Sequence, residues 1–131
     1  MLKSLSHVMI YVEDVSRAAK WYGDTFGFKP RMLAGPHYGI LFHDGMNFRL
    51  DLHPTKSGRS DMGHGPVTYF VSDDLDAEVK SLRGKGVTVE DPRSESGSPR
   101  FCSFTDSEGN IMRSKTTPKI HHFPLDFSSE F

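Results

Sequence analysis

Hydrophobic and polar residues alternate near the start of the chain and then change to a helical spacing. Residues 6–12 (SHVMIYV) predict a β-strand whose aliphatic positions 8, 10 and 12 face a core. Residues 16–26 place small and aromatic side chains three and four positions apart, which predicts an amphipathic helix with Asp14 or Ser16 as its N-cap. Gly27 follows this helix, as expected for a glycine C-cap.

Three further strands complete a first module, and the same order of elements then recurs. We predict strands over residues 29–33, 38–43 and 47–53, the last two joined by an Asp44-Gly45 turn that favours a hairpin. After a polar, glycine-rich linker at 56–63 come a strand, an amphipathic helix and three more strands, over residues 67–71, 75–83, 87–90, 100–105 and 110–114. Residues 116–131 form an aromatic tail without periodicity.

The chain is therefore predicted to contain a βαβββ unit twice, in modules of about 4–55 and 64–115 within a single domain spanning 1–131. The first strand and helix of the two modules match at an offset of 59 residues. The fourth strands match at an offset of 62, which pairs Asp51 with Arg113. Because identity between the halves is low, two unrelated α+β halves with a similar rhythm are the alternative.

Composition narrows the class of protein. Of 131 residues, 16 are Lys or Arg and 17 are Asp or Glu, and no segment has the basic density that a phosphate backbone demands, so no nucleic-acid partner is expected. No apolar run is long enough to cross a membrane, and the first residues do not resemble a signal peptide. Cys102 is the only cysteine, which fits a reducing compartment. We therefore expect a cytoplasmic protein.

A series of residues in this order resembles the vicinal-oxygen-chelate superfamily, which includes glyoxalase I, extradiol dioxygenases and the bleomycin- and fosfomycin-resistance proteins. The resemblance is carried by His7 at the start of the first strand, Asp14 at the strand–helix turn, and residues 104–110 (FTDSEGN). The last run is similar to the family's F-x-D-P-D/E-G-N hairpin, with Ser107 in place of proline. The resemblance implies an α+β fold of two βαβββ modules forming a paired, cup-shaped mixed sheet. It also implies a homodimer, with cups formed within one chain or shared between two.

In metal-dependent members of that superfamily, each module supplies the first residue of strand one and an inner residue of strand four to a divalent ion. The resemblance puts His7 and Asp51 at these positions in the first module, and Pro66 and Arg113 in the second. Proline has no donor atom there, and a guanidinium has no lone pair. Since two protein ligands rarely hold a metal, we predict no cofactor; a divalent metal on His7, Asp51 and His53 is the alternative.

The candidate residues also have purely structural interpretations. His7 could hydrogen-bond across the sheet, and Asp51 and Arg113 could form an ordinary ion pair. Cys102 lies in the middle of a predicted strand, which favours packing over nucleophilic chemistry.

The leading hypothesis is a small-molecule-binding protein of the glyoxalase/bleomycin-resistance type that uses no metal. One alternative is a lyase, isomerase or dioxygenase that uses His7 and Asp51 on a metal, or His7 as a metal-free general base. Another is an interaction module without a ligand. By alternation, we predict a ligand-binding face made of His7, Met9, Tyr11, Arg49, Asp51, Thr68, Phe70, Ile111 and Arg113, with Arg100 at the rim. Its cations and aromatic rings favour an organic anion or a planar polar ligand.

Overall fold

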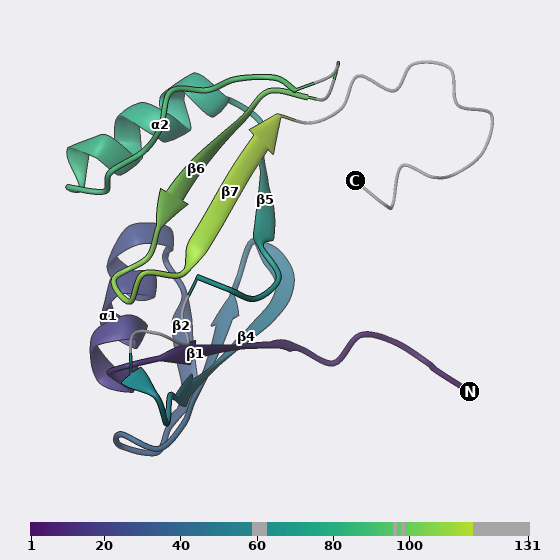
Figure 1. The fold of residues 1–131 in the computed structure, drawn as a ribbon. Coiled ribbons are helices and arrows are strands. Elements are labelled where there is room, and N and C mark those ends of the chain that lie inside the picture. Colours follow the sequence, from purple (N-terminus) through teal and green to yellow (C-terminus); the bar gives the residue numbers. More distant parts are fainter. Residues whose placement is uncertain (59–62, 96, 98, 117–131) are drawn as a thin grey trace. The chain divides into compact units, whose positions relative to one another are not determined.

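The computed structural model describes residues 1–131 except 59–62, 96, 98 and 117–131, so the predicted tail lies outside the described residues apart from Thr116. The elements follow one another as β1 (Val8–Val12), α1 (Val15–Phe26), β2 (Lys29–Leu33), β3 (Gly39–His43), β4 (Met46–Pro54), β5 (Thr68–Ser72), α2 (Leu75–Gly84), β6 (Phe101–Thr105) and β7 (Ile111–Thr116). The chain divides into unit 1, residues 1–65 with 106–110, and unit 2, residues 66–105 with 111–131 (Figure 1). The predicted α+β class is confirmed.

Unit 1 is a four-stranded mixed sheet in the order β1-β4-β3-β2, with α1 packed against it. β1 runs parallel to β4, so that Val8 pairs with Leu50 and Met9 with Asp51. The aliphatic side chains of one face are buried, with Val12, Leu50 and Leu52 fully shielded from solvent. The sequence alternation therefore identified the core face of β1 correctly, and it leaves Met9 and Tyr11 on the exposed face.

The ends of α1 follow directly from local chemistry. The Asp14 side chain accepts a hydrogen bond from the backbone N–H of Arg17 at 2.9 Å, which makes Asp14 the N-cap. Gly27 closes the helix with a φ of 79°, a left-handed conformation that costs glycine little. Glycine has a different role at position 39, where an added Cβ would lie 3.2 Å from Val15 Cγ1 of the helix. The absence of a side chain there lets α1 approach β3 closely.

Unit 2 follows the same path with one strand fewer. Its sheet has the order β5-β7-β6, with β5 parallel to β7, and α2 begins at its N-cap Asp74. The core of this unit combines Leu75, Val79 and Leu82 of the helix with Phe104 and Met112 of the sheet.

The predicted strand at residues 87–90 does not form. Instead, this segment makes two isolated bridges to β6, Val89 with Phe104 and Arg93 with Phe101. Pro92 lies between these bridges and has no backbone N–H to donate, which interrupts the regular ladder. The element is therefore present as an irregular extended segment beside β6.

Residues 106–110, which connect β6 to β7, belong to unit 1. The Glu108 carboxylate is fully buried and accepts the backbone N–H groups of Glu13 and Asp14 at 3.0 and 2.9 Å, just ahead of α1. It also pairs with the Arg17 guanidinium, with Nε donating at 2.8 Å and Nη2 at 2.9 Å. Burial raises the pKa of Glu108, but the hydrogen bonds from Arg17, Asp14 and Ser107 outweigh it and lower the pKa to about 2.

A second buried carboxylate completes this attachment. Asp106 accepts the Tyr22 hydroxyl of α1 at 2.6 Å, and it also accepts the backbone N–H groups of Glu108 and Asn110. The Asn110 side-chain amide reaches the backbone carbonyl of Tyr11 at 2.9 Å. Burial, followed by the Asp106 charge, raises the pKa of Tyr22, so its hydroxyl remains a donor. The FTDSEGN run is therefore a structural motif that binds the loop to the start and the middle of α1.

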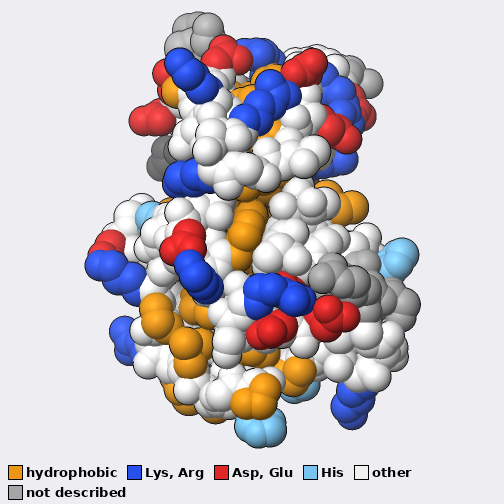
Figure 2. Space-filling model, turned by 90° about the vertical axis from the view of Figure 1, so that its left-hand side faces the viewer, with side chains coloured by type: hydrophobic (Ala, Val, Ile, Leu, Met, Phe, Trp, Pro, Cys, Tyr) orange, Lys and Arg blue, Asp and Glu red, His pale blue; other side chains and the backbone are white. Residues whose placement is uncertain are grey.

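Charges of both signs are interspersed on the surface. On the face drawn in Figure 2, Lys and Arg side chains lie beside Asp and Glu side chains. Within the described residues, no helix has the length and apolar character needed to cross a membrane.

Candidate functional site

A buried ionic cluster lies on the exposed face of the unit 1 sheet, centred on Asp51. The Asp51 side chain has no exposed surface, although neighbouring residues of that face are open to solvent. Arg49 binds it in bidentate fashion, with Nε donating to Oδ1 and Nη2 to Oδ2, both at 2.8 Å. The Tyr38 hydroxyl donates a very short hydrogen bond to Oδ2, and His7 Nε2 lies 3.4 Å from the same oxygen.

The electrostatics of this cluster favour the ionised carboxylate. Burial raises the pKa of Asp51, but the hydrogen bonds from Arg49 and Tyr38 overcome that effect and leave the pKa below its usual value. The hydrogen bond that the Tyr38 hydroxyl donates to Asp51 also raises the pKa of Tyr38. Asp51 is therefore an anion whose charge is offset inside unit 1 by Arg49.

His53 extends this face beyond the cluster. Its ring makes edge contacts with Tyr11 and Tyr38, each with ring centres 5.9 Å apart. Its Nδ1 lies 2.8 Å from the carbonyl oxygen of Pro54, and because that oxygen can only accept, Nδ1 carries the proton and Nε2 holds the lone pair of the neutral ring. Tyr11, His53, Lys56 and Ser57 line an open cavity of about 530 Å³.

The two units correspond at an offset of 60 residues in their first strands, not the predicted 59. Exposed and buried positions follow one another in the same order along the five residues of β1 and of β5. Both helices also have an aspartate as N-cap, Asp14 in unit 1 and Asp74 in unit 2. Met9 pairs with Asp51 in unit 1, and Tyr69 pairs with Arg113 in unit 2, so the offset of 62 for the fourth strands is retained. His7 therefore corresponds to Val67, and the assignment of Pro66 to that position is wrong.

Arg113 occupies the unit 2 position that corresponds to Asp51 in unit 1. Its Nε donates to Ser103 Oγ at 3.0 Å, and its Nη1 donates to the Tyr69 hydroxyl at 2.5 Å. The guanidinium carbon lies 5.5 Å from the centre of the Tyr69 ring and 4.9 Å from that of Phe101. Within the described part of the chain, no carboxylate forms an ion pair with Arg113. The arginine is therefore held by a hydroxyl on each side, and its charge is not paired with a carboxylate of the described residues.

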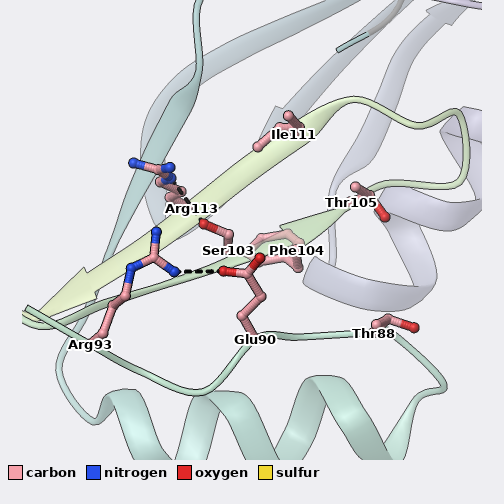
Figure 3. Close-up of a pocket in the computed structure, with 8 residues that line it drawn as sticks. All are labelled: Thr88, Glu90, Arg93, Ser103, Phe104, Thr105, Ile111 and Arg113. Atoms are coloured by element: carbon pink, nitrogen blue, oxygen red, sulfur yellow. Dashed lines mark hydrogen bonds and ion pairs between the residues drawn. The ribbon is translucent and has the colours of Figure 1, made fainter.

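An open cavity of about 300 Å³ lies beside Arg113 within unit 2 (Figure 3). It is lined by hydroxyl, apolar and charged side chains: Thr88, Glu90, Arg93, Ser103, Phe104, Thr105, Ile111 and Arg113. A second cation at the edge, Arg93, is neutralised, because its Nη1 lies 2.7 Å from Glu90 and its Nη2 lies 3.2 Å from Glu95.

The structure brings some of the predicted residues together on one face and places others on the opposite face. His7, Met9, Tyr11, Arg49, Asp51 and His53 share one face in unit 1, and Ile111 and Arg113 share one in unit 2.

The placement of Thr68 and Phe70 on that face of unit 2 is wrong. Tyr69 contacts Arg113, and since side chains alternate along a strand, residues 68 and 70 point to the opposite face. The placement of Arg100 at the rim is also wrong, because its guanidinium is paired with Asp76 of α2 at 3.1 Å. Both errors concern unit 2.

Sequence reasoning missed several side chains of these sites, among them Glu90 and Ser103, which line the Arg113 cavity. Tyr38, Tyr69, Phe101 and Arg93 each contact a predicted residue or line the same cavity. A shift of one residue in the internal match would have found Tyr69, because it places Tyr69 opposite Arg113 as Met9 is opposite Asp51. The contacts of Tyr38, Phe101 and Arg93 depend on rotamers, which the sequence pattern does not show.

The residues at the four superfamily metal positions do not fit a divalent ion. Val67 offers no donor atom, and Arg113 adds a positive charge. Both carboxylate oxygens of Asp51 already accept hydrogen bonds from Arg49. The positive charge of Arg49 would also repel a divalent metal ion bound to Asp51. Among the described residues, no group of three or more His, Cys, Asp or Glu side chains is arranged to hold a metal.

Residues 4–113 match the family model of the glyoxalase/bleomycin resistance protein/dioxygenase superfamily. The match spans most of the chain and agrees with the order of strands and helices, so the protein belongs to this superfamily. No curated protein matches the sequence.

Solved structures share the fold at low sequence identity. Lactoylglutathione lyase from Agrobacterium tumefaciens has a TM-score of 0.69 and 16% identity, covering 87% of this chain and 94% of its own. The fosfomycin resistance protein FosX from Mesorhizobium loti has a TM-score of 0.69 and 16% identity, covering 91% and 96%. TnmS3, an antibiotic-binding protein from a Streptomyces species, has a TM-score of 0.62 and 23% identity, covering 88% and 98%. At these identities the likeness concerns the fold alone.

Proposed function

We propose that the protein binds a small organic anion at the Arg113 cavity of unit 2 and that it does so without a metal. The observation that carries this proposal is a guanidinium that is fixed on a sheet face, borders an open cavity and has no carboxylate partner among the described residues. A guanidinium has five N–H donors, and Ser103 and Tyr69 use two of them. The other three remain to bind a carboxylate or a similar oxyanion.

The surroundings of Arg113 support an organic ligand over an inorganic ion. Tyr69 and Ile111 are part of the same face, and 46% and 38% of their surfaces are exposed. Ser103, Thr88 and Thr105 add hydroxyl groups around the cavity. Apolar surface with a few converging polar groups is typical of small-molecule sites, and the volume lies at the lower end of their range.

Replacing Arg113 tests this function, and Arg100 provides a matched control. We expect Arg113→Ala to weaken the binding of benzoate, a simple aromatic carboxylate, by about 1.5–3 kcal/mol in an NMR titration, the usual value of a charge-assisted hydrogen bond. Arg100→Ala removes the same charge from the α2 side of unit 2 and should leave benzoate binding unchanged. Equal binding by the parent and Arg113→Ala would contradict the proposal.

A catalytic function of the unit 1 cluster is the second candidate. Its specific support is the 3.4 Å contact of His7 Nε2 with the buried Asp51 carboxylate, an arrangement that orients a general base. If the protein functions without a metal, as we propose, the purified protein should contain no stoichiometric zinc, nickel, manganese or iron. Elemental analysis that found about one metal per chain, lost in His7→Ala, would favour the metal-dependent alternative over it.

Two further expectations accompany the proposal. We propose a homodimer on the basis of superfamily membership, and light scattering at micromolar concentration should give twice the chain mass of 14.7 kDa. A cytoplasmic location, expected from the composition, stays a prediction.

A further inference from the structure

We propose that Glu90 makes the Arg113 cavity selective for singly charged anions and disfavours dianions such as phosphonates and phosphate monoesters. The inference rests on the proposed function, because it concerns the ligand class of the same cavity. It adds a specificity-determining residue that does not need to touch the anchored carboxylate.

The two arginines that line the cavity differ in whether their charge can pair with a ligand. Arg93 is held between two glutamates, Glu90 at 2.7 Å and Glu95 at 3.2 Å, so its charge is offset before any ligand arrives. Among the described residues, the partners of Arg113 are hydroxyl groups and aromatic rings. Arg93, Arg113 and Glu90 together give the lining a net charge of +1.

Arg113 can pair with one negative charge of the ligand, whereas a second charge finds no free cation in the lining, because Arg93 is already paired with Glu90 and Glu95. A carboxylate can accept hydrogen bonds from the N–H groups of Arg113 Nη1 and Nη2 that Ser103 and Tyr69 do not use. A second charge would lie in the same small cavity as the Glu90 carboxylate, close enough for repulsion. The hydroxyls of Thr88, Ser103 and Thr105 can donate to neutral oxygens of the ligand, but they do not neutralise a charge.

Figure 3 shows how this arrangement is built. Glu90 projects from the extended segment beside β6 toward Arg93, and Ser103 and Arg113 come from the adjacent strands of the same sheet. Glu90 retains 60% of its side-chain exposure, so replacing it with glutamine should leave folding intact. Glu95, which also pairs with Arg93 but does not line the cavity, provides the matched control.

Three probes separate charge from shape: benzoate, phenylphosphonate in mildly alkaline buffer where it is a dianion, and methyl phenylphosphonate, a monoanion with the same tetrahedral centre. We expect the parent protein to bind the two monoanions more tightly than the dianion, by roughly three- to tenfold at low salt. Glu90→Gln should remove most of this preference. Glu95→Gln should retain it, because this variant also loosens Arg93 but leaves the cavity charge in place.

The outcomes distinguish this inference from the function on which it rests. If the parent binds all three probes equally through Arg113, or if Glu90→Gln retains the preference, the selectivity proposal is overturned while the anion site stands. Discrimination against both phosphonates alike would also overturn it, because shape and not charge would then decide. Binding that does not depend on Arg113 would overturn the proposed function, and the selectivity with it.

Discussion

The corresponding sheet faces of the two units differ in the charge of one residue, which is acidic in unit 1 and basic in unit 2. In unit 1 the inner position of the fourth strand is Asp51, whose charge is satisfied by Arg49 and Tyr38. In unit 2 the corresponding residue is Arg113, with which no carboxylate of the described residues forms an ion pair. The sequence predicted both residues and their correspondence. It could also have predicted the Arg49–Asp51 pair, because residues two apart in a strand share a face, whereas the contact of Tyr38 depends on its rotamer.

We expect the Asp51 cluster to contribute to stability. Asp51→Asn keeps the shape of the side chain but removes the charge that accepts two hydrogen bonds from Arg49, which should lower the free energy of unfolding by about 1.5–3 kcal/mol. Urea denaturation at neutral pH measures the change. Asp44→Asn is the control, because Asp44 pairs with Lys29 on the surface and its loss should not be measurable. Equal stability of parent and Asp51→Asn would show that the cluster is not closed as described.

At the scale of elements, local signals were sufficient for both helices and most strands. Three helix caps can be recognised in the sequence, and the structure has all of them: Asp14 and Asp74 are N-caps, and Gly27 is a C-cap. The segment at 87–90 was mistaken for a strand because its apolar alternation is genuine, whereas the missing donor of Pro92 acts two residues later. The one-residue error in β5 had a larger effect, since it moved Thr68 and Phe70 to the wrong face.

The buried Glu108 carboxylate in the loop at 106–110 should make the stability of the fold depend on pH. The pKa of Glu108 falls from its ordinary value of 4.5 to about 2 in the folded chain. A depressed carboxyl pKa stabilises the fold fully above about 4.5, and this contribution is lost as the pH falls toward 2. Glu108→Gln should therefore lower the free energy of unfolding by about 2 kcal/mol at neutral pH.

The pH profile distinguishes this contribution from a general effect of mutation. The stability difference between the parent and Glu108→Gln should shrink steadily as the pH is lowered from 5 to 3. Asp73→Asn, which removes an exposed acid just before α2, should give the same profile as the parent. A difference that stays constant with pH would mean that Glu108 acts through shape alone.

At the scale of the whole molecule, the internal repeat explains the path of the chain but not its chemistry. Both units place a parallel pair of strands beside an antiparallel one, β1-β4-β3 and β5-β7-β6, with a helix between the first two strands in sequence. Periodicity predicted this architecture because it depends on which residues are apolar. It could not predict the sites, which depend on side chains that share a strand position and differ in charge.

The loss of the superfamily metal positions can be tested by restoring them. In the corrected register, Val67 of unit 2 corresponds to His7 of unit 1, and Arg113 corresponds to Asp51. In addition, the Arg49 guanidinium occupies the Asp51 carboxylate that would have to bind the metal. In metal-dependent members of the superfamily, four such positions surround one ion. The triple variant Arg49→Met, Val67→His, Arg113→Glu should therefore supply two imidazoles and two carboxylates without a competing cation.

If these four positions surround one ion in this chain as they do in metal-dependent members of the superfamily, the triple variant should bind zinc at about micromolar concentration or tighter in a calorimetric titration. Its Tm should then rise with zinc, because a metal that binds only the folded state stabilises it. The parent should show neither effect. In the control triple variant, Pro66→His takes the place of Val67→His. The new imidazole then lies one residue before the position that the register of β5 and β7 assigns to a metal ligand, and zinc should bind no better than to the parent. Tighter binding by the Pro66 variant would restore the offset of 59 and refute the register derived from β5 and β7.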